Sequence, residues 1–194
     1  MTADHHRTAP VTDTLLLITL KLNARLQPEH RHVLFEDPLE GLLEGASLGE
    51  ITGGGTALTD DGEVEYGDIE VALNSADDLP KVLALMDQLG APKGSVVQRA
   101  GAPDEAFGVT EGLGLYLNGT DLPDEVYEQY DSNELFEKIV ASIEGVGEVC
   151  SWWQGPTETA LYLYGSSFDV LNERIAELVA TYPLCQGARV VRTA

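Results

Sequence analysis

The sequence contains few cysteines and few lysines. The two cysteines, Cys150 and Cys185, lie far apart, and neither belongs to a Cys-x-x-Cys pair. Isolated cysteines of this kind are typical of small buried hydrophobic side chains. A disulfide or a catalytic thiol is the alternative interpretation.

The chain also lacks a long apolar run. Its longest apolar stretches, such as residues 15–18, are far too short to span a bilayer. The first fourteen residues are polar and include Pro10, so they do not form a secretory signal. We therefore expect a soluble cytoplasmic protein with no membrane contact, and a disordered tail over residues 1–13.

No catalytic motif occurs in the sequence. The run Gly53-Gly54-Gly55-Thr56 suggests a phosphate loop, but it lacks the lysine that a P-loop needs and it leads into a strand. We find no Ser-His-Asp, Cys-His or Gly-x-Ser-x-Gly arrangement. We expect no catalytic residue and no cofactor, and enzymatic activity is less favoured than binding.

Metal-ligating patterns are weak as well. His30 and His32, with Glu29, Glu36 and Asp37 nearby, could bind zinc. A loop does not hold such ligands in a fixed geometry, so a solvated loop is the favoured interpretation. The acidic residues from Asp60 to Glu70 do not have the spacing of an EF-hand loop. We therefore predict no metal site.

Basic residues are scarce overall. The chain has 33 Asp and Glu against 11 Lys and Arg, which gives a formal net charge of -22. Such a field repels nucleic acid, because binding requires cations that displace counterions from phosphates. It would attract a basic protein partner. Adaptation to high salt, where acidity serves solubility, explains the same composition equally well.

Hydrophobic periodicity predicts a β-α-β-β-α-β order in residues 14–100. Strands are expected at residues 14–26, 50–59, 63–74 and 95–99, with helices at residues 38–44 and 76–89. Asp61-Gly62 predicts the hairpin turn. In the third strand, Val64 and Tyr66 are out of phase with Ile69, Val71 and Leu73, so we expect a bulge near Gly67 that turns both sets inward.

The same order returns in residues 111–194, after a linker at residues 101–110. Strands are expected at 111–118, 147–154, 159–164 and 188–193, with helices from Ser132 and over 167–181 and an acidic insertion at 120–130. Gly49-Glu50-Ile51 and Gly147-Glu148-Val149 open equivalent strands. The fold class is therefore α+β, as a tandem duplication of ferredoxin-like halves with antiparallel sheets.

Two groups of residues are candidates for binding a partner. One group is acidic and lies in the first hairpin and in the insertion of the second half: Asp60, Asp61, Asp68, Glu70, Asp121, Asp124 and Glu125. We expect these carboxylates to gather on one surface if acidity serves recognition. The other group is Trp152 and Trp153, which point to opposite faces of a strand, so one of them is expected to be exposed. Solvation of an exposed face, and a purely structural role for the aromatic residues, are the alternatives.

A resemblance covers residues 49–95. The run Gly53-Gly54-Gly55-Thr56, then Gly62-Glu63 and Asp68-Ile69-Glu70, and finally Gly90-Ala91-Pro92-Lys93-Gly94-Ser95, resembles small bacterial domains of the immunity-protein type. The resemblance carries over no catalytic residue. It implies a protein that neutralises a basic toxin or nuclease by binding it.

Three functional hypotheses follow. The first is a non-enzymatic, acidic, protein-binding protein that captures a basic partner by charge complementarity and a tryptophan anchor. The second is a small-molecule-binding enzyme or sensor with a cleft between the two halves. The third is a housekeeping protein of a salt-adapted organism. Fold alone does not choose among them, because ferredoxin-like domains host many activities.

Overall fold

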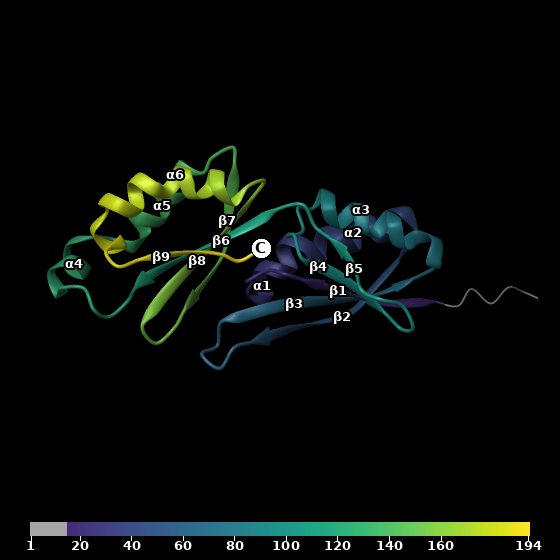
Figure 1. Cartoon of the computed structure of the whole chain (residues 1–194). Coiled ribbons are helices and arrows are strands. Elements are labelled where there is room, and N and C mark those ends of the chain that lie inside the picture. Colours follow the sequence, from purple (N-terminus) through teal and green to yellow (C-terminus); the bar gives the residue numbers. More distant parts are fainter. Residues whose placement is uncertain (1–14) are drawn as a thin grey trace, which may run out of the picture.

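The computed structural model describes residues 15–194, so the predicted tail at residues 1–13 lies outside the described range. The chain forms two α+β halves, each with an antiparallel sheet that carries its main helices on one face (Figure 1). Both halves have the predicted β-α-β-β-α-β order. The architecture is therefore a tandem pair of ferredoxin-like halves.

The first half contains the five-stranded sheet. Its elements in chain order are β1 (Leu16–Leu22), α1 (Pro28–Arg31), η1 (His32–Glu36), α2 (Asp37–Ala46), β2 (Gly49–Leu58), β3 (Val64–Leu73), η2 (Ala76–Asp78), α3 (Leu79–Gln88), β4 (Ser95–Arg99) and β5 (Glu105–Phe107). The strand order across the sheet is β2-β3-β1-β4-β5.

The second half contains the four-stranded sheet. Its elements are β6 (Glu111–Asn118), α4 (Asp124–Gln129), α5 (Ser132–Ser142), β7 (Gly147–Gln154), β8 (Glu158–Gly165), α6 (Phe168–Thr181), η3 (Pro183–Cys185) and β9 (Arg189–Arg192). The order β7-β8-β6-β9 repeats the order of the first four strands of the first sheet.

The two halves also share a β-bulge. Between the pairs Ile51–Val71 and Gly53–Glu70, β2 has one extra residue, Thr52. Between the pairs Val149–Leu163 and Ser151–Tyr162, β7 has one extra residue, Cys150. Each bulge follows the Gly-Glu-apolar opening directly. A bulge at the same place in both hairpins is a backbone feature that supports duplication independently of strand order.

Alternation places the core on the helix-covered face of each sheet. In β1, Ile18, Leu20 and Leu22 are buried, while Thr19 and Lys21 face outward. The second half has its own core, in which Leu113, Leu115 and Leu163 of the sheet pack with residues of α5 and α6. Helix α3 ends where the sequence predicts: Gly90 adopts a positive φ of 80° after it, which a glycine tolerates without strain. The predicted stop at Gly45 is wrong, because α2 continues to Ala46 and Ser47 takes the left-handed conformation.

Three local predictions need correction. The segment around His30 and His32 is helical from Pro28 onward, not a loop that precedes a helix at residue 38. The predicted linker at 101–110 includes β5, which pairs antiparallel with β4 and extends the first sheet. The bulge in β3 lies at Glu65 rather than at Gly67.

The bulge at Glu65 has a different effect from the predicted one. It turns Val64 inward, where the residue is 1% exposed, but it leaves Tyr66 on the outer face. There the ring of Tyr66 lies 3.6 Å from Lys21 Nζ, a cation–π contact between neighbouring strands.

Candidate functional site

The outer face of the second sheet is covered by the first half. Tyr116, Trp153, Tyr162 and Tyr164 belong to the same buried cluster as Leu26 and Phe35 of the first half. Gly112 and Gly114 lie on the same face, and a Cβ at either position would come within 3 Å of an aromatic ring or of Thr193. The junction between the halves is therefore an aromatic layer, and its packing requires the two glycines.

This aromatic layer buries one of the two adjacent tryptophans and leaves the other exposed. Trp153 is 8% exposed and lies in the junction, whereas Trp152 is 48% exposed. One tryptophan is thus exposed, as the alternation on the strand predicts. Trp153 is not accessible as an anchor for an external partner.

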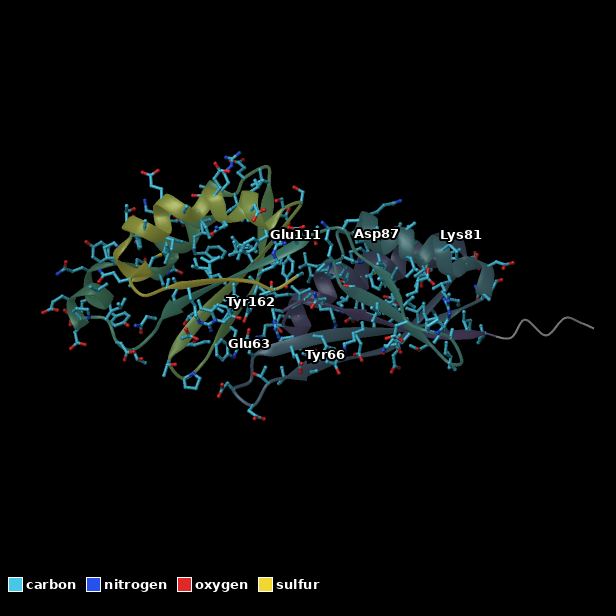
Figure 2. The ribbon with its side chains drawn as sticks, viewed as in Figure 1. Glu63, Tyr66, Lys81, Asp87, Glu111 and Tyr162 are labelled. Carbon is cyan, nitrogen blue, oxygen red and sulfur yellow. The ribbon has the colours of Figure 1, made fainter. Side chains whose placement is uncertain are left out.

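Glu63 is the polar centre of the junction. Its Oε1 atom accepts hydrogen bonds from the hydroxyl groups of Tyr116, at 2.5 Å, and Tyr162, at 2.7 Å. Figure 2 labels Glu63 and Tyr162 where the two halves meet. Arg25 Nε lies 3.9 Å from the same oxygen. Burial, followed by the Glu63 carboxylate, raises the pKa of Tyr116 to about 12 and raises the pKa of Tyr162 as well. Both phenols are therefore neutral donors that fix the β2–β3 hairpin against the second sheet.

A second set of hydrogen bonds joins the segment after β1 to β7 and β8. The Tyr164 hydroxyl accepts from the backbone N–H of Arg25 at 2.8 Å. Ser151 Oγ accepts from the backbone N–H of Gln27 at 3.2 Å and lies 2.9 Å from His30 Nδ1. Ser151 is 3% exposed, so these contacts position the halves and do not form an accessible Ser-His pair.

Glu111, at the start of β6, connects the halves by charge. Its carboxylate accepts from the Phe168 backbone N–H at 2.8 Å, from Lys93 Nζ at 2.9 Å and from Arg192 Nη1 at 2.9 Å. These contacts, the backbone one first, lower the pKa of Glu111 to about 2. Lys93 belongs to the first half, so the pair ties the end of α3 to the second half.

The predicted acidic residues do not form one surface. Asp60 and Asp61 lie exposed in the β2–β3 turn, and Glu70 is exposed on β3, whereas Asp68 is only partly exposed. Asp121, Asp124 and Glu125 are exposed at α4, which lies at the outer end of the second half, well away from that turn (Figure 1). The expected gathering of the two groups is therefore wrong, because the insertion points away from the first half.

Most cations of the described chain are neutralised locally. Ion pairs with carboxylates involve Arg25, Arg31, Lys81, Lys93, Arg99, Lys138, Arg189 and Arg192. The remaining carboxylates lie on helices and strands of both halves. The electrostatic potential at the surface is consequently negative over many helices and strands. Charge alone therefore does not mark a binding site, which has to be identified by the shape of the surface.

One surface combines a hollow, exposed apolar side chains and acidic groups. We call it the α5–β7 groove; it has a volume of about 580 Å³ and is lined by Phe136, Glu137, Val140, Ala141, Ile143, Glu144, Gly145, Gly147, Glu148 and Val149. Phe136 and Val140 are 42% and 43% exposed. Within residues 15–194, no lysine or arginine lines this groove. β7 is the edge strand of its sheet, so one side of its backbone is unpaired in the described chain.

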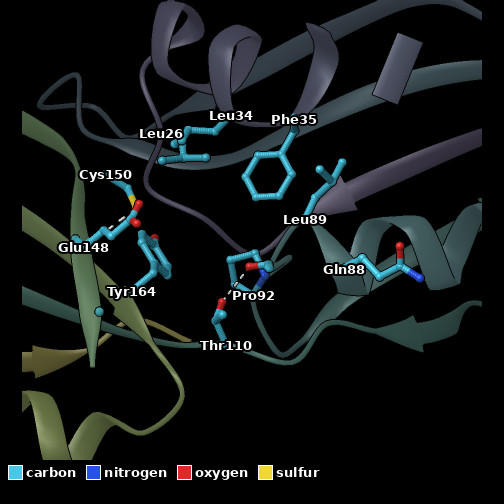
Figure 3. Close-up of a pocket in the computed structure, with 12 residues that line it drawn as sticks. Leu26, Leu34, Phe35, Gln88, Leu89, Pro92, Thr110, Glu148, Cys150 and Tyr164 are labelled. Carbon is cyan, nitrogen blue, oxygen red and sulfur yellow. Dashed lines mark hydrogen bonds between the residues drawn. The ribbon is translucent and has the colours of Figure 1, made fainter. Parts of the chain in front are cut away.

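A second hollow lies between the halves, and we call it the interdomain cleft (Figure 3). It encloses about 290 Å³ and is lined by Leu26, Leu34, Phe35, Gln88, Leu89, Gly90, Pro92 and Thr110 of the first half and the connection, and by Gly147, Glu148, Cys150 and Tyr164 of the second half. Most of its wall is apolar. Glu148 is its one ionisable carboxylate.

Neither cysteine has the chemistry of a nucleophile. Burial, followed by the nearby negative charge of Glu148, raises the pKa of Cys150 to about 12. Burial raises the pKa of Cys185 to about 11. Both are free thiols that stay protonated near neutral pH. In the part of the chain that the structure describes, no cluster of three His, Cys, Asp or Glu side chains could hold a metal ion.

Comparisons with known proteins add only remote structural similarity. No family model and no curated protein matches the chain. Among solved structures, the first two RRM domains of yeast poly(U) binding protein share 13% identity, with 92% of this chain and 99% of that chain covered and a TM-score of 0.24. A candidate glycine cleavage system transcriptional repressor shares 13%, with 92% and 95% covered and a TM-score of 0.29.

A third structure, a candidate monooxygenase from Fusobacterium nucleatum, shares 10% identity, with 94% of this chain and 92% of that chain covered and a TM-score of 0.29. The fold assignment rests on the strand order within each half and not on these likenesses. Among residues 15–194, no helix has the length and apolarity that crossing a bilayer requires.

A cleft between the halves was one hypothesis from the sequence, without lining residues, whereas the α5–β7 groove was not predicted; one signal for the junction was present. Ala160-Leu161-Tyr162-Leu163-Tyr164 is apolar at every position, which is typical of a strand covered on both faces. That pattern indicates a second layer over the sheet. A weaker sequence signal for the α5–β7 groove was also present. Phe136 and Val140 widen the apolar stripe of α5 beyond what one sheet can cover.

Proposed function

We propose that this chain is a non-enzymatic binding protein that takes a cationic, partly apolar protein segment into the α5–β7 groove. The observation that carries the proposal is an apolar hollow bordered by Glu137, Glu144 and Glu148, beside an edge strand, with no basic residue in its lining. A partner of the opposite charge would be drawn in by the overall field and would then bury Phe136 and Val140.

An extended segment suits this groove best. The unpaired edge of β7 offers backbone donors and acceptors to an added strand, and alternate side chains of that strand would face the floor of the groove. Trp152 lies on the same strand and is exposed, so it would extend the apolar contact. The carboxylates at the β2–β3 turn and at α4 would contribute to long-range attraction and not to contact.

The immunity-type resemblance makes a basic toxin or nuclease the concrete form of this partner. We propose a cytoplasmic location for the complex; both cysteines are free thiols, which fits a reducing compartment. Neutralisation would act by steric occlusion, because the site has no group suited to chemistry on the partner.

A peptide titration tests the proposal. The probe is a labelled peptide of alternating lysine and leucine, followed by fluorescence anisotropy across a salt series. The double variant Glu137→Gln/Glu144→Gln should bind this peptide about tenfold more weakly. The control variant Glu173→Gln/Glu177→Gln makes the same change in net charge on α6, and it should bind almost as the wild type does. Equal losses in both variants would reduce the interaction to general charge and reject the groove.

The apolar part of the groove has its own test. Val140→Arg places a bulky cation on the floor and should abolish peptide binding, whereas Val170→Arg, at a similarly exposed position on α6, should not. A peptide of the same composition in a helical pattern should bind less well than the alternating peptide. Stronger binding of the helical peptide would exclude strand addition.

A further inference from the structure

The interdomain cleft is a second candidate site, which shares Gly147 and Glu148 with the α5–β7 groove and is otherwise lined by different residues. Its walls from the first half are apolar and come from Leu26, Leu34, Phe35, Leu89 and Pro92. The two halves are held at this place by hydrogen bonds from backbone N–H groups to Tyr164 Oη and Ser151 Oγ. The cleft is therefore a space between fixed walls, and its size is at the lower end of small-molecule sites.

Polar side chains are few in the lining: Gln88 of the first half, Thr110 of the connection, and Glu148 and Tyr164 of the second half. The Thr110 hydroxyl is engaged, since it donates to the Gly90 carbonyl at 2.8 Å. The Tyr164 hydroxyl accepts from the Arg25 N–H. Glu148 is exposed and makes no ion pair with any residue of the described chain, and the cleft lining contains no lysine or arginine. An apolar space with one unpaired carboxylate at its edge selects a ligand with an apolar body and a cationic head.

We propose that the interdomain cleft binds a small primary amine with an aromatic or branched alkyl body, with its ammonium group on the Glu148 carboxylate and its apolar part against Leu34, Phe35 and Leu89. This proposal goes beyond the binding of a protein partner. It assigns to the chain a small-molecule site formed by both halves, and the ligand enters without chemistry because the nearby Cys150 thiol is not a nucleophile.

Cys150 provides a direct readout of the cleft. It lines the cavity and is partly exposed, and Cys185→Ser would leave it as the single thiol of the chain. In that variant, labelled with carbon-13 at the cysteine Cβ, phenethylamine should shift the Cys150 Cβ resonance in a saturable manner, and calorimetry should give a matching affinity. Binding without a shift of the Cys150 resonance would place the amine elsewhere and overturn the proposal.

Three probe molecules of similar shape test whether the cleft selects for a positive charge. Phenethylamine should bind more tightly than phenethyl alcohol, and hydrocinnamate should bind weakest. Glu148→Gln should weaken phenethylamine by about tenfold or more and leave phenethyl alcohol almost unchanged. Equal effects on the amine and the alcohol would reject the role of the carboxylate.

Two further variants separate this site from the groove. Leu89→Phe narrows the cleft and should reduce binding of both amine and alcohol, with folding checked by circular dichroism. Glu137→Gln/Glu144→Gln lies outside the cleft lining and should retain amine binding while it loses the cationic peptide. Loss of the amine in this double variant would show that only one acidic surface exists and would overturn the cleft proposal.

Discussion

The two halves share their strand order but differ in the segment that precedes the first main helix. In the first half, Arg31 joins this segment to the far end of β2. Its guanidinium bonds to Glu36 Oε1 at 2.6 Å, to the Gly55 carbonyl oxygen and to Thr56 Oγ1. In the second half, the α5–β7 groove lies at the other end of the corresponding strand, where Gly147, Glu148 and Val149 open β7.

The difference arises in the segment that precedes each main helix. In the first half, α1 and η1 continue into α2 and place Arg31 above Gly67. In the second half, α4 turns away, and Tyr127 bonds back to its own loop through the Asn118 carbonyl and the Leu122 N–H. The same topology thus tolerates two different segments before its first main helix, one bonded to the sheet and one turned away from it.

The outer faces of the two sheets also differ, and here the first half is the one that is open to solvent. The second sheet is covered by the first half, whereas the first sheet keeps its outer face open, with Leu17 64% exposed. Each half therefore has one open side, and the open sides are on different surfaces.

Removal of the Arg31 side chain should have the largest effect. Arg31→Ala leaves the partly buried Glu36 carboxylate with His32 alone and removes the donor to the Gly55 carbonyl, so we expect the free energy of unfolding to fall by about 3–5 kcal/mol. Urea denaturation measures this loss. The control Arg174→Ala, exposed on α6, should change stability by less than about 0.5 kcal/mol. A loss below about 1 kcal/mol for Arg31→Ala would mean that its ion pair contributes no more than an exposed one does.

Replacement of glycine by alanine should change the stability of the protein in opposite directions at two positions of the first half. A Cβ at Gly67 would lie 3.0 Å from Arg31 Cδ, so Gly67→Ala should destabilise by about 1–3 kcal/mol. A Cβ at Gly45, in α2, meets nothing within 4 Å, so Gly45→Ala should stabilise by about 0.5–1 kcal/mol. Thermal unfolding of both variants checks the pair. Stabilisation by Gly67→Ala would show that Arg31 has room to move.

The contribution of the junction to stability can be measured by substituting tyrosines on the outer face of the second sheet. Tyr162→Phe removes a buried hydroxyl that donates to Glu63 and should cost about 1.5–3 kcal/mol. Because Tyr116 donates to the same oxygen, the double variant with Tyr116→Phe should not give the sum of the two single losses. Additive losses in chemical denaturation would show that the two phenols act independently.

The smallest expected effect is a change in how the stability of the protein depends on pH. The pKa of Glu111 is lowered from 4.5 to about 2 in the folded protein, so its carboxylate stabilises the fold above about pH 4.5. That contribution is lost as the pH falls from about 4.5 toward 2. Glu111→Gln should therefore lose less stability than the wild type on acidification, whereas Glu173→Gln should follow the wild type. Parallel stability curves for wild type and Glu111→Gln would contradict the role of Glu111.

Sequence reasoning gave the topology because alternation and helical spacing are local signals. It missed α1 and η1 because Pro28 to Arg31 is polar and precedes a π-helical turn, and it missed β5 because three residues between Pro103 and Gly108 have no periodicity. The residues that line the cleft and the α5–β7 groove could not be predicted. They depend on the distance between α5 and β7 and on how the halves meet, which no local pattern encodes.

The covered sheet has a consequence for biosynthesis. A ribosome completes the first half before β8 is made, and domains tend to fold in the order of synthesis. The aromatic face formed by Tyr116, Trp153, Tyr162 and Tyr164 can then dock at once on a finished surface. A second half synthesised alone would keep that face in water and would self-associate, so the chain order itself protects the protein from aggregation during its production.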